Sequence, residues 1–599
     1  ADYNKVKTYT DPRNKVTTMT YDTKGNVTQV KDPLNNVTNM TYDSQGHVLT
    51  MTSGSGGNTI TRTYTYDVND VRTVTEGGYT STFTTDTLGR VTAMTDGRGN
   101  VSYYEYDNRS RLIKATDPIG KITQLQYDGN GNITKVTDAA NAITQYAYDP
   151  RNRLTSITDP FNVVEQWTWD NKGNLATYKD RRNKTTTFSY DALDRLSGTI
   201  YADATSTTFG YSYPTGALAE MTMTEGTNTI TRRFDNRDRL SYEVTPQGRI
   251  DYAYDAADRR SSMTVQNQTP ISYTWDDGDR VTALTQGARN IALAYDQANR
   301  RSKITFPGTL EQRMTYAKPW GRPSAISYFA GATPAQLDAL TGATFDGDGR
   351  PISRTATAAV NGIPNAVNTL PTAFTASYTN NRLTTFNGAA WTYDAQGNLT
   401  GDGTNTYVWD VRNRLIQIKQ GATVTASFEY DALNRRTKKI IGAASTEYLH
   451  DGLTPVQEQR VGDITQLITG PGIDDYLSRI TTTIGATPTT TTRNYLTDFL
   501  GSTTALADDA GAIKTTYGYE PYGEATVAGE ATVNSFQYTG RENDATGLYY
   551  YRARYYSPKA KRFISEDPIG QSGGINTYGY VGGAPLSAID PFGLSTIFK

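Results

Sequence analysis

A dyad of an aromatic residue and aspartate returns along the chain at a fixed step, and this periodicity constrains the fold more than any other feature. Successive copies stand 21 residues apart, as from 106 to 127. Each dyad opens a turn such as the segment from Tyr21 to Val27, in which Asp22 can cap backbone N–H groups and Gly25 accepts an unusual dihedral angle. The longest regular series is Thr85-Asp86, Tyr106-Asp107, Tyr127-Asp128, Tyr148-Asp149, Trp169-Asp170 and Tyr190-Asp191.

The segments between the dyads alternate in polarity and therefore read as half-buried strands. Val27 to Val30 shows this period of two. Proline falls mostly in the opposite turns, as at Pro33 and Pro118, where it interrupts no ladder. No 3.6-residue apolar stripe is sustained, and propeller blades of about 40 residues are roughly twice this repeat. Each unit is therefore predicted to be a strand–turn–strand hairpin.

A ribbon of such hairpins has to curl. About 25 hairpins would contribute about 50 strands at roughly 4.8 Å each, or on the order of 240 Å of sheet. Sheets twist, and long open sheets coil or close. The sequence therefore predicts an all-β protein in which a long ribbon of antiparallel β-hairpins spirals into a hollow cocoon or barrel-like shell. Tyrosines at equivalent positions are expected to stack in ladders along it.

Composition excludes several classes of function. The 59 basic and 61 acidic residues leave a net charge of −2, which gives no electrostatic case for nucleic acid or a membrane. Without cysteine there are no disulfides or thiolate metal sites, and His47 and His450 each read as ordinary repeat residues. No apolar run of about 18 residues, phosphate loop or dinucleotide fingerprint is present, so no membrane segment and no cofactor are expected. Ala1 in place of methionine indicates a processed or trimmed start.

The repeat weakens between about 310 and 390. Ala, Thr and Gly dominate there, as in Ala330 to Ala335. We expect an irregular insertion of longer loops or a short helix, placed at Pro334 to Leu340.

From about Tyr495 the pattern becomes specific. The ordered blocks are Tyr495 to Thr503, Tyr517 to Glu524, Tyr538 to Glu542, Thr546 to Tyr556, Arg562 to Gly570, Asn576 to Val581 and Asp590-Pro591-Phe592-Gly593-Leu594. At these residues the chain resembles the RHS (rearrangement hotspot) family, and its RHS repeat-associated core in particular. This family includes polymorphic toxins, type VI secretion effectors and the C subunits of insecticidal toxin complexes.

The resemblance implies a domain division and a function. Residues 1–494 would form the repeat shell, 495–594 the core that plugs one end, and 595–599 the remnant of a variable C-terminal toxin region. Family members enclose that toxin and cut the chain after the Asp-Pro-x-Gly-Leu motif, here between Leu594 and Ser595. The expected partners are the chain's own toxin domain and an upstream delivery or plug module. The shell would be monomeric, and secreted or delivered by a bacterial secretion or toxin system.

Carried over residue by residue, the motifs nominate Asp567 and Asp590 as an aspartyl-protease-like pair with Arg554 as electrostatic partner. Pro591 and Gly593 would shape the turn that returns the cut bond. Two close carboxylates share a proton, so one can activate water while the other assists the leaving amine. An arginine would stabilise the ionised form or an oxyanion. Only single-turnover self-cleavage, and no turnover enzyme, is expected.

Other interpretations remain open. Asp117 to Gly120 repeats the tetrapeptide of Asp567 to Gly570 within an ordinary hairpin, so this motif alone signals a turn. Ser595 could attack the Leu594 carbonyl by an acyl shift, or Asp590–Pro591 could break in acid. The second class of function is a cell-surface adhesion or recognition module that is not cleaved. The family pattern also departs at Lys561, where relatives commonly carry glycine, and at Ala584.

Overall fold

Antiparallel hairpins make up almost the whole computed structural model, which describes residues 5–54, 59–67, 70–76, 78–213, 219–316, 323–331, 335–345, 351–356 and 374–598. In these residues a 33-stranded sheet runs from β1 (Thr8–Thr10) to β33 (Pro351–Ala356), and a 14-stranded sheet from β37 (Thr392–Tyr393) to β50 (Ala525–Gly529). Consecutive strands pair throughout both sheets. The predicted all-β hairpin ribbon is confirmed.

Three small sheets complete the described part. The first consists of β34 (Ala376–Thr379), β35 (Arg382–Phe386) and β36 (Ala389–Ala390). The second consists of β51 (Glu542–Asn543), β52 (Tyr549–Tyr551), β53 (Arg554–Ser557) and β54 (Arg562–Phe563), and the third of β55 (Ala588–Ile589) and β56 (Ile597–Phe598).

The hairpin joining β2 (Val16–Tyr21) to β3 (Val27–Lys31) shows why the dyad recurs. The register shifts between Thr20 and Tyr21, so the aromatic residue sits at an irregularity in the ladder. Asp22 Oδ1 then accepts the backbone N–H groups of Lys24 and Asn26 at 2.8 and 2.9 Å. Burial of a short, sharply turning loop needs such partners for its N–H groups. The aspartate therefore closes the turn that the aromatic residue begins.

Contacts between successive units differ from the expected ladder of stacked tyrosines. The Tyr127 hydroxyl donates to the Leu112 carbonyl oxygen in the preceding hairpin at 2.7 Å. Arg111 bonds Asp107 through Nε at 2.7 Å and places its guanidinium 4.6 Å from the centre of the Tyr127 ring. The same arginine–aromatic contact recurs at Arg90–Tyr106, Arg153–Trp169, Arg195–Tyr211, Arg239–Tyr254, Arg259–Trp275 and Arg280–Tyr295. An arginine of one unit thus contacts the aromatic residue of the next, which the dyad alone did not reveal.

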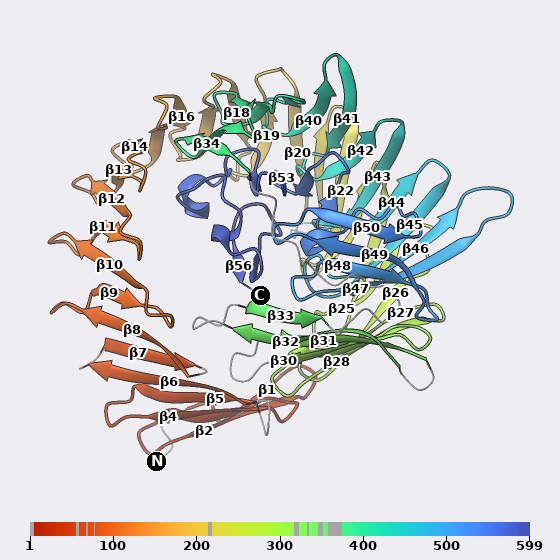
Figure 1. Cartoon of the computed structure of the whole chain (residues 1–599), viewed down its shortest axis with the longest axis horizontal. Coiled ribbons are helices and arrows are strands. Elements are labelled where there is room, and N and C mark those ends of the chain that lie inside the picture. Colours follow the sequence, from red (N-terminus) through yellow and green to blue (C-terminus); the bar gives the residue numbers. More distant parts are fainter. Residues whose placement is uncertain are drawn as a thin grey trace.

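The ribbon curves until the start of the first sheet lies beside its later strands (Figure 1). Figure 1 shows the first sheet sweeping around from β2 through β16 and β28, with the second sheet alongside its far side and the blue C-terminal segment inside the curve. The turn containing Arg13 reaches the turn of Asp279, with 2.9 Å between Arg13 Nη1 and Asp279 Oδ1. Further along, Arg435 Nη1 of the second sheet lies 2.7 Å from Glu243 Oε1 of the first. Turns of one wrap therefore bond to turns or strands of the next, and the ribbon forms a spiral shell.

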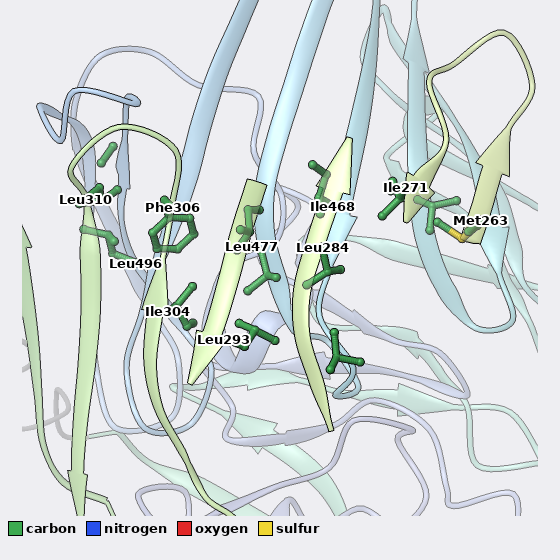
Figure 2. Packing of buried hydrophobic residues seen from close by; sticks show 14 of the residues in the cluster. Met263, Ile271, Leu284, Leu293, Ile304, Phe306, Leu310, Ile468, Leu477 and Leu496 are labelled. Atoms are coloured by element: carbon green, nitrogen blue, oxygen red, sulfur yellow. The ribbon is translucent and has the colours of Figure 1, made fainter. Parts of the chain in front are cut away.

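The largest apolar cluster joins the two long sheets (Figure 2). Its members are buried, and they come from the first sheet between residues 250 and 328 and from the second between 449 and 507. Figure 2 shows Leu284 and Leu293 on strands that neighbour those of Ile468 and Leu477. A second cluster is built mainly from tyrosines of residues 467–589. Apolar burial therefore holds the two wraps together and anchors the C-terminal segment.

The described part of the expected insertion continues the first sheet. β30 (Glu311–Tyr316), β31 (Pro323–Ala330) and β32 (Ala335–Phe345) pair in order, so the short helix expected at 334–340 is wrong from Ala335 onward. Pro334 and residues 357–373 lie outside the described residues. The second sheet also runs through residue 495 to β50, so the division at 494 stays a prediction. Within the described residues, no helix combines the length and apolar character that crossing a membrane requires.

Candidate functional site

Arg554, Asp567 and Asp590 come from three different elements and meet at one point. Arg554 begins β53, Asp567 follows β54, and Asp590 follows β55. Arg554 Nη2 lies 2.8 Å from Asp567 Oδ2 and 3.4 Å from Asp590 Oδ2. One guanidinium nitrogen therefore bridges the two carboxylates that the sequence nominated.

Burial sets the charge state of this group. All three side chains are at most 7% exposed. Burial raises the pKa of Asp567 to about 6, against the opposing effect of Arg554, and it also raises the pKa of Asp590. Burial lowers the pKa of Arg554 to about 10, so the guanidinium remains charged at neutral pH. A charged arginine thus faces two carboxyls that hold a proton more readily than usual.

Other contacts fix the orientation of Arg554. Its guanidinium lies 3.6 Å above the Phe563 ring, and its Nη1 donates to the Thr577 carbonyl oxygen at 2.9 Å. Its Nε donates to the Gly593 carbonyl oxygen, one residue before Leu594. The arginine therefore ties the carboxylate pair to the loop that carries the predicted cut.

The predicted scissile bond folds back onto Asp590. Asp590 Oδ1 accepts the N–H groups of Leu594 at 3.0 Å and Ser595 at 3.1 Å. β56 pairs with β55, placing Ile597 opposite Ile589, so the chain reverses between them. Leu594 is half-buried, whereas Ser595 is exposed. The amide nitrogen of the Leu594–Ser595 bond is thus in direct contact with a carboxylate.

Two glycines allow this close packing. Gly593 has φ 68°, and a Cβ on it would lie 2.5 Å from the Tyr551 carbonyl oxygen. A Cβ on Gly573 would lie 2.4 Å from Asp567 Oδ2 and 2.8 Å from the Leu594 carbonyl oxygen. Asp567 and the carbonyl of the predicted cut therefore face the same small space. This glycine was not nominated from the sequence.

The repeated tetrapeptide separates into two environments. In the wall, Asp117 Oδ1 accepts the N–H groups of Ile119 and Lys121 in an exposed turn. Asp567 Oδ1 likewise accepts the Ile569 N–H at 3.0 Å, but its second oxygen faces Arg554. The local turn is therefore shared, and the distant partner makes the difference.

Arg552 and Glu566 also contribute and were missed as site residues. Arg552 donates to the Pro591 carbonyl oxygen, and Glu566 precedes Asp567 in a buried ion network. The block Thr546 to Tyr556 contains two arginines, and that spacing was the available signal. Lys561 has φ 59°, which explains why glycine suits its position.

The two histidines have other surroundings. His47 contacts Asp43 at 2.9 Å and stacks on Tyr66. His450 is buried in the second sheet, where burial and nearby arginines hold its pKa well below the usual range.

Comparison with known proteins gives the family of the repeat. The family model "RHS Repeat" matches residues 2–37, 21–59, 86–122, 127–164 and 169–206. The chain is 31% identical over 228 residues to the tRNA3(Ser)-specific nuclease WapA of Bacillus spizizenii, covering 36% of this chain and 9% of that protein. It is 39% identical over 106 residues to the toxin subunit YenC1 of Yersinia entomophaga, covering 17% and 11%. The aligned regions thus span about a tenth of these relatives.

The fold has a solved counterpart. The crystal structure of TcdB2-TccC3 without its hypervariable C-terminal region matches with a TM-score of 0.60 and 16% identity. The match covers 97% of this chain and 38% of that one. At this identity the likeness concerns the fold: both chains build the same kind of β-shell.

Proposed function

The chain belongs to the RHS-repeat proteins, and on that premise we propose that it encloses a C-terminal toxin polypeptide and frees it by a single cut between Leu594 and Ser595. The observation that carries the proposal is the contact of Asp590 Oδ1 with the Ser595 N–H, beside a second carboxyl and a charged arginine. The cargo would be the polypeptide that follows the cut, and a bacterial secretion or toxin system would deliver it.

The geometry supports a water-mediated cut. One carboxylate takes a proton as water adds to the Leu594 carbonyl carbon, giving a tetrahedral intermediate. The other carboxyl gives a proton to the Ser595 nitrogen as the carbon–nitrogen bond breaks. Because Asp590 accepts the Ser595 N–H while Asp567 has its pKa raised to about 6 and faces the carbonyl, Asp590 is suited to activate the water and Asp567 to supply the proton. The products are a carboxylate on Leu594 and an amine on Ser595.

Intact-mass measurement on freshly made protein tests the cut. Wild type should lose residues 595–599, while Asp567→Asn and Asp590→Asn should keep them. Ser595→Ala should still be cut by the water route and should block an acyl shift. A product ending at Asp590 would indicate acid cleavage at Asp590–Pro591 instead. Unchanged cleavage in both asparagine variants would overturn the mechanism.

Enclosure needs a separate measurement. A chain extended beyond Lys599 by a protease-sensitive reporter should protect that reporter from added protease, even after the internal cut. A reporter digested as fast as free reporter would rule out enclosure. A specific glycan affinity in a chain that is never cut would favour the adhesion module.

A further inference from the structure

The segment that carries Asp567 is held by the shell wall as well as by the core. The Glu566 carboxylate lies between two arginines: Oε2 is 2.8 Å from Arg181 Nη2, and Oε1 is 3.0 Å from Arg382 Nη2. Arg181 sits in the turn between β17 (Leu175–Lys179) and β18 (Thr185–Tyr190), and Arg382 begins β35. Both arginines are more than nine-tenths buried. We call Glu566, Arg181 and Arg382 the wall clasp.

Further contacts surround the wall clasp. Asp159 Oδ2 lies 2.9 Å from Arg181 Nη1, so the neighbouring turn of the first sheet supports the arginine. The Tyr578 hydroxyl lies 3.2 Å from Glu566 Oε1 and donates to the Gly397 carbonyl oxygen at 2.7 Å. The same core segment touches β14 (Ile143–Tyr148), whose Tyr146 hydroxyl donates to Gln571 at 3.0 Å.

The charges in the wall clasp are complementary. Burial alone would raise the pKa of Glu566, but Arg181 and Arg382 outweigh it and lower that pKa. The carboxylate therefore stays ionised and accepts charge-assisted hydrogen bonds from both arginines. A neutral glutamine in its place would leave two buried guanidiniums short of a counter-charge.

The loop of Asp590 depends on the wall through a different contact. Arg552 donates to the Pro591 carbonyl oxygen and lies 2.6 Å from Asp474 Oδ1. Asp474 stands in the turn between β45 (Asp463–Thr469) and β46 (Tyr476–Thr483) of the second sheet. The first sheet thus holds one carboxylate and the second sheet holds the other.

We propose that Glu566 is a positioning residue that brings Asp567 to the cut only when Arg181 and Arg382 of the wall hold it. The inference rests on the proposed self-cleavage. Arg181 and Glu566 are 385 residues apart, so their contact forms only after the first sheet has met the core. Cleavage requires reacting groups placed within a fraction of an ångström, and a misplacement of about 1 Å can cost roughly 100-fold in rate. The cut therefore follows closure of the shell.

Time-resolved intact mass of the full chain tests the clasp. Glu566→Gln and Arg181→Gln should slow cleavage by about 10- to 100-fold without changing the product terminus at Leu594. Arg181→Lys, which keeps the charge, should recover part of the rate. The matched control is Arg412→Gln, because Arg412 Nη1 makes a similar contact of 2.7 Å, but with Glu225 of the first sheet and not with the segment that carries Asp567. The control should cleave at the wild-type rate.

Hydrogen exchange separates positioning from misfolding. In an Asp590→Asn background, Arg181→Gln should raise hydrogen exchange in residues 566–579 of the core and leave the wall protected. If wild type and Glu566→Gln are cleaved equally fast, Glu566 does not position Asp567, while the proposed function stands. If wild type never cuts, the proposed function fails and the positioning role fails with it. Loss of protection throughout the wall in Arg181→Gln, with the lysine variant no faster, would also overturn the clasp.

Discussion

At the residue scale, the bridging of Asp567 and Asp590 by Arg554 ties the cleavage rate to pH. The pKa of Asp567 is raised to about 6, so this carboxyl keeps its proton below that pH and loses it above. The singly protonated pair is the active form, so the rate should fall about tenfold per pH unit above pH 6. It should also fall in acid, once the ionised carboxylate is protonated. Initial rates from pH 4 to 9 would measure this.

The titration of Asp567 also changes the stability of the fold with pH. A carboxyl whose folded pKa exceeds its unfolded value stabilises the fold most below the unfolded pKa, and that contribution is lost as pH rises toward 6.

A cleavage rate that instead increases steadily from pH 6 to 9 would contradict the carboxylate pair. Asp117→Asn, in the exposed copy of the tetrapeptide, serves as the control and should leave the profile unchanged.

The second residue-scale prediction concerns Gly573. A methyl group on it would meet Asp567 Oδ2 at 2.4 Å and the Leu594 carbonyl oxygen at 2.8 Å, so Gly573→Ala must push these atoms apart. We expect cleavage to slow by about 100-fold, with little change in thermal unfolding, measured by intact mass and calorimetry. Gly129→Ala, in a wall turn, is the control, because a Cβ there has nothing within 4 Å and the backbone φ is not positive. Equal cleavage by both variants would show that the space beside Asp567 is not needed.

At the element scale, the turn aspartates should differ in importance according to burial. Asp431 is 8% exposed, accepts the Leu433 and Arg435 N–H groups at 2.9 Å, and bonds Arg435 Nε at 2.7 Å. Asp431→Ala removes one of the two carboxylates that the buried Arg435 contacts, the other being Glu243, and should lower the free energy of unfolding by about 2 kcal/mol. Asp149→Ala removes the same kind of turn contact, but the Asp149 side chain is 16% exposed, so the loss of unfolding free energy should be distinctly smaller. Denaturant unfolding and hydrogen exchange at each turn would compare the two variants. Equal losses of unfolding free energy would refute a role for burial.

The hairpin is also the scale at which the sequence was most informative. The dyad step and the polar alternation were enough to predict strands, turns and the curling ribbon, because both patterns follow from local backbone geometry. The strand β32 was missed because Ala and Gly have weak strand preference, and its pairing with β31 decides the outcome. Asp567 and Asp590 were nominated through their motifs. Glu566 and Gly573 were not, because their roles depend on residues far away in the chain.

At the scale of the whole molecule, the ion pairs that join successive wraps form a seam, and these pairs differ in strength along the spiral. Near the start it is held by Arg13 with Asp279, whose carboxylate is 59% exposed, and by Lys15 with Asp277 at 2.8 Å. Farther along, Arg435 and Glu243 are each only 3% exposed. Exposed ion pairs are weak and screened by salt, whereas buried ones are screened much less. The first wrap should therefore be the least secure part of the shell.

This gradient predicts where the shell opens first. Raising the salt concentration from about 0.05 M to about 1 M shortens the Debye length from more than 10 Å to about 3 Å. Hydrogen exchange should then rise in residues 8–42 and change little around residues 240–245 and 430–436. Asp279→Asn should produce the same opening at low salt, since it removes the partner of Arg13, while Asp67→Asn, in an exposed pair within one hairpin, should not. Opening that starts at the buried seam would mean that apolar packing between the sheets, rather than these ion pairs, sets the order.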